Sequence, residues 1–304
     1  MKNVLVVGGS GFIGKNLSVY LSNYFNVSVL DRLIDEEYFA KFSRINCIRC
    51  DLNNEIDLIE DKYHYIINLV SIVTAERDLY LFSHLYESNV KVLLDLYHKV
   101  NRFKTLELFV QFGSAEEYGA IESPFKESTR EEPNSPYALI KQLTTNLALM
   151  LHSNYAFPSM VVRPGNLFGP YQNNTKFIPY LINELLNDRE VKVTPCEHYR
   201  DFIYVDDFSY LVKEVLIKSE RFKGEIVNIS SGQSYKLKSI IEYCISKLNS
   251  KSKVLFGYYP YRENESMDLK CSISKLESLL DQKIELDFYR KLEEYIKTFK
   301  NSNL

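Results

Sequence analysis

Features that mark special classes of protein are missing from this sequence. No apolar stretch reaches the length of a membrane-spanning helix. The N-terminal MKNVLVVGG is too short, and ends in the wrong residues, for a secretory signal peptide. Neither sign of charge dominates, because the formal net charge is -3 over 304 residues. That balance gives no general attraction to nucleic acid or anionic lipid, so we expect neither as a partner.

Cysteine and histidine are also scarce, with five of each. The odd number and scattered positions of the cysteines argue against a disulfide framework. Cys47 and Cys50 form a CxxC pair, but the companion ligands of a zinc site are missing, and the surrounding run INCIRC reads as a strand. No two histidines have ligand spacing. We therefore predict no metal site, reduced cysteines and a cytoplasmic location.

The sequence does contain a regular alternation of strand-like and helix-like segments. The strand-like runs are nearly continuous in apolar residues, as strands buried on both faces should be. They cover residues 3–8, 27–31, 46–50, 65–70, 106–112 and 159–164. Helical patterns separate several of them, at 12–24, 83–101 and 137–153. This alternation predicts an α/β fold of the Rossmann type, with a doubly wound parallel sheet covered by helices.

Beyond about residue 170 the alternation loosens, which predicts a second unit. Helical patterns there cover 177–188, 206–219, 236–249, 274–280 and 288–299, with short strands near 191–194 and 225–229. We predict an NAD(P)-binding domain over residues 1–165 and a smaller C-terminal α/β domain over 166–304. Part of 200–232 is expected to return to the first domain.

The segment VVGGSGFIG places Gly8, Gly11 and Gly14 between the first strand and the first helix, and Asp31 ends the next strand. This context is typical of a dinucleotide fingerprint, in which the backbone and the helix N-terminus approach a pyrophosphate. Asp31 can bind the ribose hydroxyls of NAD, whereas a 2′-phosphate would meet a like charge there. The adjacent Arg32 would soften that preference, so NAD is favoured and NADP stays open. The other expected cofactor contacts are Phe12, Ile13, Asp51, Leu52, Leu69, Tyr137 and Lys141.

A possible acid–base group lies in NSPYALIK. Ser135 and Pro136 predict the start of a helix, on which Tyr137 and Lys141 share one face. A nearby ammonium favours a phenolate, so we expect Lys141 to lower the pKa of Tyr137.

The segment FGSAEEYG follows the fifth strand and carries the remaining expected catalytic residues. Ser114 is the expected hydrogen-bond partner in catalysis. Glu116 is the residue whose role would decide the reaction type. We interpret Glu117 as part of a solvated turn.

Together these residues form a set that resembles the extended short-chain dehydrogenase/reductases, and it looks most like their nucleotide-sugar epimerase/dehydratase/reductase group. The similar motifs are SAEEYG, VVRPGNLFGP, RDFIYVDD, VNISSGQS and YRENE. One departure is NLVS at 68–71, where relatives often carry a His-Leu-Ala-Ala type stretch. The resemblance implies that the C-terminal domain binds a nucleotide-diphosphate sugar through Asn166, Arg200 and Arg262. It also implies a homodimer formed through helices 83–101 and 137–153.

The resemblance further implies that Tyr137 exchanges a proton with a sugar oxygen while hydride passes to or from nicotinamide. A 4,6-dehydratase needs an additional acid and base, but here Ala115 replaces the usual polar companion of Glu116. We therefore predict hydride transfer at sugar C4, with a reductase of nucleotide-linked 4-keto-6-deoxyhexoses ahead of a 4-epimerase and then a dehydratase. A sensor or scaffold that binds NAD(P) without chemistry is the non-enzymatic alternative.

Overall fold

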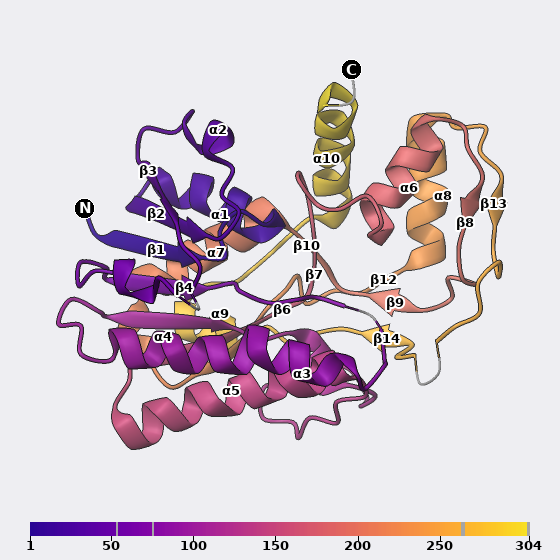
Figure 1. Cartoon of the computed structure of the whole chain (residues 1–304). Helices are drawn as coiled ribbons and strands as arrows, with labels where there is room; N and C mark the ends of the chain where they lie inside the picture. The colour runs from indigo at the N-terminus through magenta and orange to yellow at the C-terminus, as the bar shows by residue number, and fades with distance from the viewer. Residues whose placement is uncertain (53, 75, 263–264, 303–304) are drawn as a thin grey trace.

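A seven-stranded parallel sheet forms the centre of the molecule (Figure 1). The computed structural model describes residues 1–52, 54–74, 76–262 and 265–302. The strand order is β11-β6-β5-β4-β1-β2-β3. The bounds are β1 Asn3–Val7, β2 Asn26–Asp31, β3 Ile45–Arg49, β4 Tyr65–Asn68, β5 Leu108–Phe112, β6 Ser159–Pro164 and β11 Ile226–Ile229. The order reverses between β1 and β4, where the carboxyl ends of the strands create a ligand-binding crevice.

Helices cover both faces of this sheet, which confirms the predicted doubly wound α/β architecture. The helices nearest the sheet are α1 Phe12–Ser22, α2 Glu36–Phe39, α3 Leu81–Tyr86, α4 Val92–Val100, α5 Pro136–Tyr155, α7 Val205–Ile217 and α9 Ser274–Leu280. In Figure 1, α3, α4 and α5 lie below the sheet, and α1 and α7 lie above it. None of the helices in the described ranges is both long and apolar enough to span a bilayer.

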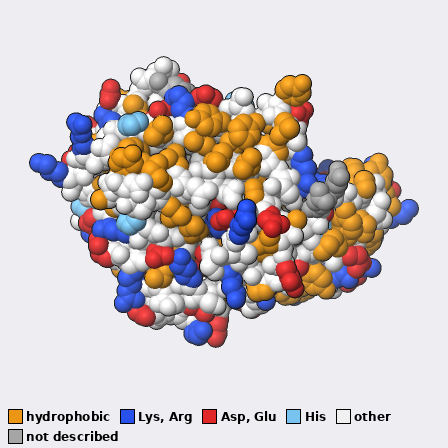
Figure 2. Space-filling model, turned by 90° about the horizontal axis from the view of Figure 1, so that it is seen from below, with side chains coloured by type: hydrophobic (Ala, Val, Ile, Leu, Met, Phe, Trp, Pro, Cys, Tyr) orange, Lys and Arg blue, Asp and Glu red, His pale blue; other side chains and the backbone are white. Residues whose placement is uncertain are grey.

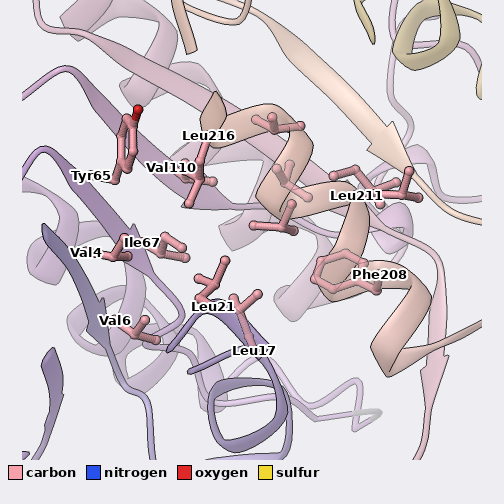
Figure 3. Close-up of a cluster of buried hydrophobic side chains, with 14 of the residues drawn as sticks. Val4, Val6, Leu17, Leu21, Tyr65, Ile67, Val110, Phe208, Leu211 and Leu216 are labelled. Carbon is pink, nitrogen blue, oxygen red and sulfur yellow. The ribbon is translucent and has the colours of Figure 1, made fainter. Parts of the chain in front are cut away.

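Alternation along the strands divides the core into two layers. Val4 and Val6 of β1 pack in the cluster with α1 and α7, whereas Leu5 and Val7 pack on the opposite face with α4 and α5. Figure 3 shows Leu17 and other side chains of α1 and α7 meeting those of β1, β4 and β5. Burial on both faces explains why these strands are continuous in apolar residues.

A second core lies in the C-terminal part of the chain. It is built around α6 Phe177–Leu186, α8 Leu237–Leu248 and α10 Phe288–Ser302. Short strands connect it to the rest of the molecule: β7 Asn166–Phe168, β8 Val191–Lys192, β9 Tyr199–Arg200, β10 Phe202–Tyr204, β12 Tyr235–Lys236, β13 Val254–Leu255 and β14 Asp268–Leu269. Between α6 and α8 the chain returns to the main sheet through α7 and β11.

The helix expected over 83–101 is interrupted. A π-helical turn, η2 Glu87–Lys91, separates α3 from α4. Asn89 in this turn is buried and donates a side-chain hydrogen bond to the Leu85 carbonyl at 2.9 Å. Hydrophobic spacing alone could not reveal the change, because one wider turn hardly alters which residues face the core.

Candidate active site

The glycine loop between β1 and α1 has the shape of a phosphate cradle. Gly8 has a φ of 74°, and its N–H donates to the Leu30 carbonyl at 2.8 Å. A Cβ on Gly14 would lie 2.4 Å from the Gly9 carbonyl oxygen, so only glycine lets α1 approach the loop this closely. A Cβ on Gly11 would meet nothing nearer than 4.0 Å, and Gly11 begins α1 without a side-chain cap. Open space and uncapped N–H groups fit a dinucleotide pyrophosphate.

Asp31 lies beside this loop, at the carboxyl end of β2. Its carboxylate accepts hydrogen bonds from the Ser10 N–H at 2.9 Å and the Leu33 N–H at 3.1 Å. Both bonds hold the carboxylate at the edge of the cradle, where a dinucleotide ribose would lie. Arg32 is exposed next to it. This geometry fits the predicted ribose contact.

The other expected cofactor residues surround the same crevice. Phe12 and Ile13 are half-buried in the first turn of α1, and Leu69 follows β4. Asp51 and Leu52 follow β3 and are also half-buried. All five therefore lie after the carboxyl ends of strands, as their sequence positions predict.

Tyr137, Lys141 and Ser114 come together from two elements. The Ser135 hydroxyl accepts a hydrogen bond from the Ala138 N–H at 3.1 Å and begins α5, as predicted. Tyr137 and Lys141, one turn apart on α5, are both buried. Ser114 follows β5, and its hydroxyl is close enough to the Tyr137 phenol to lower the pKa of that group.

The pKa of Tyr137 moves in the direction opposite to the one expected from the sequence. Burial raises it to about 12, and the hydrogen bond with Ser114 offsets only part of that rise. Burial also lowers the pKa of Lys141 to about 8. The Lys141 ammonium donates to the Phe112 carbonyl at 2.5 Å, which anchors it at the end of β5. The sequence showed the proximity of these groups, but it could not show how strongly burial would act on them.

The interpretation of Glu117 as a solvated residue is wrong, because its side chain is fully buried. One carboxylate oxygen accepts the Ser114 N–H at 2.7 Å. The other accepts the Thr145 hydroxyl and the Arg163 Nε–H, each at 2.8 Å. Glu117 therefore fixes the backbone of the segment that carries Ser114.

Arg163, at the end of β6, explains why an acid is buried here. Its side chain is fully buried, pairs with Glu117 and Glu131, and lies 4.6 Å over the ring of Tyr118. The sequence analysis missed this network. An arginine in the otherwise apolar run SMVVRP was the available clue, because a buried guanidinium needs an acidic partner.

Glu116 points in a different direction from its neighbour and is exposed. Its charge acts on two groups, raising the pKa of Tyr137 and stabilising the cationic form of Arg200. Glu116 is therefore close enough to Tyr137 and to Arg200 for its charge to act on both.

The three expected diphosphate ligands are in different environments. Arg200 forms an ion pair with Glu265 and donates to the Ser266 carbonyl at 2.8 Å. Asn166 donates a side-chain hydrogen bond to the Asp201 carbonyl at 3.3 Å.

Arg262 is exposed in a loop, and the next two residues of its motif, 263 and 264, lie outside the described residues. Arg200 would have to exchange a carboxylate for a phosphate to fulfil the predicted role, which stays a prediction.

Asp201, next to Arg200, is a structural anchor that the sequence analysis did not identify. Its buried carboxylate accepts hydrogen bonds from the backbone N–H groups of Ser231, Gly232 and Cys271, and from the Ser231 hydroxyl. These bonds fix the backbone directly after Arg200 against two loops.

The five cysteines are free thiols, and burial raises the pKa of Cys50 to about 11. Within the part of the chain that the structure describes, no cluster of three or more His, Cys, Asp or Glu side chains could hold a metal ion. Cys47 lies in β3 and packs against one core layer, and Cys50 follows this strand and is buried in the other.

Comparison with known proteins places these features in context. The profile of the NAD dependent epimerase/dehydratase family matches residues 4–230, which is most of the chain. Among curated relatives, dTDP-4-dehydro-6-deoxyglucose reductase of Escherichia coli is 28% identical over 301 residues, covering 90% of this chain and 91% of the relative. The dTDP-D-glucose 4,6-dehydratase of Dictyostelium discoideum is 26% identical over 260 residues. That match covers 76% of this chain, and the chain spans only 58% of the length of the relative.

Solved structures share the fold over the whole chain. UDP-N-acetylglucosamine 4-epimerase from Methanobrevibacter ruminantium M1 superposes with a TM-score of 0.90 at 24% identity, covering 100% of this chain and 99% of the epimerase. UDP-glucuronic acid 4-epimerase from Bacillus cereus, solved with UDP-glucuronic acid and NAD, also gives 0.90, at 22% identity and 99% coverage of both chains. At these identities the likeness concerns the fold.

Proposed function

The chain belongs to the NAD-dependent epimerase/dehydratase family, and from this premise we propose that it catalyses hydride transfer at C4 of a nucleotide-linked sugar. The favoured reaction is reduction of a 4-keto-6-deoxyhexose. The observation that carries the proposal is the proximity of Ser114, Tyr137 and Lys141, with the exposed Glu116 close to Tyr137.

NAD fits the cradle at Gly11 and the carboxylate of Asp31. When bound, the cofactor supplies the hydride acceptor or, in its reduced form, the hydride donor. Asp31 favours NAD over NADP, because its negative charge would repel a 2′-phosphate. The role of the protein is then to position the sugar, exclude water and move one proton.

Tyr137 is the group that would move this proton. During reduction its phenol would donate a proton to the C4 oxygen as the carbonyl carbon gains hydride, and during oxidation its phenolate would take the proton back. Ser114 would donate a hydrogen bond to the same oxygen. Lys141, mostly cationic near neutral pH because its pKa is about 8, would stabilise the phenolate by its charge.

The surroundings of Tyr137 support a reductase or an epimerase over a dehydratase. Dehydration needs a base and an acid in addition to the tyrosine. Glu116 is exposed beside Tyr137, but Ala115 has no titratable group and Glu117 is committed to Arg163. Near-complete alignment with a reductase supports our preference for reduction over epimerisation.

A 4-epimerase is the second candidate, and Asp31 is the observation that favours it. An epimerase needs NAD that stays bound and is regenerated within each turnover, and the fixed Asp31 carboxylate favours NAD. Whether the purified protein retains NAD separates the two reactions, because a reductase must exchange its spent cofactor.

The test combines cofactor analysis with turnover. Mass spectrometry of the denatured, as-purified protein would reveal retained NAD. Separately, UDP- and dTDP-linked 4-keto-6-deoxyhexoses would be mixed with NADH or NADPH, and UDP-hexoses would be incubated without added cofactor. A reductase consumes reduced cofactor only with the keto sugar, whereas an epimerase produces the C4 epimer of a UDP-hexose, which NMR detects.

Tyr137→Phe is the decisive variant in both assays. We expect turnover to fall by roughly 100-fold or more, the usual contribution of a positioned general acid, while NAD binding measured by calorimetry changes little. Undiminished turnover in this variant would refute the assignment of the site.

A homodimer is part of the proposal, and a hydrophobic helical face supports it. Figure 2 shows hydrophobic side chains on the side seen from below, where α3, α4 and α5 lie in Figure 1. The partly exposed apolar side chains of these helices are Tyr86, Leu94, Leu139, Leu143 and Met150, each 36–41% accessible. Exposed apolar surface of this kind commonly marks a contact between subunits.

A further inference from the structure

Ser71 lies in a segment that packs against the glycine loop. It follows β4 in the irregular segment 69–74, directly after Val70. A Cβ on Gly8 would lie 2.9 Å from the Val70 nitrogen, so this segment contacts the phosphate cradle. Ser71 is therefore adjacent in the chain to a residue that contacts the cradle.

The Ser71 hydroxyl is buried and lacks a well-formed hydrogen bond. It nevertheless approaches the Tyr137 phenol closely enough to lower the pKa of that group, as Ser114 also does. A buried hydroxyl without a partner costs free energy, so its retention calls for an explanation such as a role in catalysis. The partner within reach here is the phenol oxygen.

We propose that Ser71 is a positioning residue that donates a hydrogen bond to the Tyr137 oxygen during proton transfer. This inference rests on the proposed function of Tyr137. A second donor to the phenol oxygen is needed because Ser114 has a single O–H group to donate. Once Ser114 donates to the sugar oxygen it no longer donates to the phenol.

Other groups near Tyr137 do not donate this hydrogen bond to its phenol oxygen. The Lys141 ammonium is anchored to the Phe112 carbonyl, and the negative charges of Glu116 and Glu117 oppose the phenolate. A hydroxyl donor at Ser71 would stabilise the phenolate when Tyr137 gives up its proton, and would point the phenol at the C4 oxygen.

The proposal is testable without a substrate. Difluorotyrosine, incorporated at position 137, ionises at a lower pH than tyrosine and reports its protonation through the ¹⁹F chemical shift. The titration is compared in the otherwise unmodified protein, Ser71→Ala, Ser71→Cys and Ser71→Thr. We expect Ser71→Ala to raise the apparent pKa by roughly 0.5–1 pH unit, the effect of one ordinary hydrogen bond.

The other variants separate hydrogen bonding from packing. Ser71→Thr keeps the hydroxyl, so residue 137 should titrate as in the parent. Cysteine is a weak donor of similar size, so the apparent pKa in Ser71→Cys should lie between those of the parent and Ser71→Ala. Thr74→Ala removes a hydroxyl from the same segment that accepts the Glu76 N–H at 3.1 Å, and should leave the titration unchanged.

An unchanged titration in Ser71→Ala, with a clear shift in Ser114→Ala, would overturn the role of Ser71. Because the titration needs no turnover, that result is distinct from a failure of Tyr137→Phe to reduce activity, which would instead refute the proposed function. In the turnover assay, Ser71→Ala should also move the pH profile upward in proportion to the ¹⁹F shift. Loss of activity without that movement would indicate a purely structural role.

Discussion

At the residue scale, the two adjacent glutamates of FGSAEEYG have opposite environments. Glu116 is exposed, whereas Glu117 is fully buried and pairs with Arg163. Both have the same chemical group and neighbouring positions in the chain. They therefore provide a matched comparison of an exposed carboxylate with a buried one.

We predict that Glu117→Gln destabilises the fold by about 3 kcal/mol, because it leaves buried Arg163 with Glu131 as its remaining acidic partner. Glu116→Gln should change stability by less than about 0.5 kcal/mol, as expected for a surface substitution. Urea unfolding at neutral pH measures both. Equal losses in the two variants would contradict the structural role of Glu117.

Asp31 allows a second prediction at this scale. Asp31→Ala should weaken NAD binding more than NADP binding, because it removes both a ribose acceptor and the charge that repels a 2′-phosphate. Asp35→Ala is the control, since this nearby carboxylate pairs with Lys15 at 2.5 Å. Calorimetric titration with each cofactor gives the ratio of affinities. A parallel loss for both cofactors in Asp31→Ala would exclude the ribose contact.

At the scale of single elements, α5 begins where its catalytic residues are needed. Ser135 caps the helix and Tyr137 lies in its first turn. We predict that Ser135→Ala costs about 1 kcal/mol of stability and also lowers turnover, because the first turn loses its anchor. Ser153→Ala, at the exposed far end of the same helix, should affect neither. Normal turnover in a destabilised Ser135→Ala protein would show that the cap does not position Tyr137.

The contrast between α5 and the α3–α4 region shows what the sequence could reveal. The start of α5 was predictable because Ser135 and Pro136 act locally on the backbone. The π turn at Glu87–Lys91 was not, because it depends on packing against α5 and on the buried Asn89. The short strands near 191–194 and 225–229 were predicted and correspond to β8 and β11, but the other short strands after β6 were missed, since two- or three-residue pairings carry almost no periodicity.

A similar limit applies to the site. The glycine loop, Asp31, Ser114, Tyr137 and Lys141 were predictable because each occupies a fixed position relative to a strand or a helix start. The roles of Ser71 and Glu117 depend on contacts between segments distant in sequence. Propensity assigned Glu117 to solvent, and the tertiary pairing with Arg163 overrode that assignment.

At the scale of the whole molecule, the expected substrate contacts come from two parts of the chain. The main sheet and its helices carry the cradle and Tyr137, while β9, which lies outside that sheet, carries Arg200. Glu116 interacts electrostatically with Arg200, so a substrate beside these two residues would contact both parts. A rigid scaffold on the α5 side would hold Tyr137 in a fixed position relative to that substrate.

A dimer through α3, α4 and α5 would provide such a scaffold, and it leads to a prediction for the assembly. Leu143 and Met150 lie seven residues apart on one face of α5, so Leu143→Glu/Met150→Glu would place two charges in the proposed interface. We expect this double variant to be monomeric at micromolar concentrations where the parent is dimeric, as measured by sedimentation equilibrium. Ile217→Glu is the control, because Ile217 is 55% exposed at the end of α7 on the opposite face of the sheet. A parent protein that sediments as a monomer, or a double variant that remains dimeric, would show that this face is not the subunit contact.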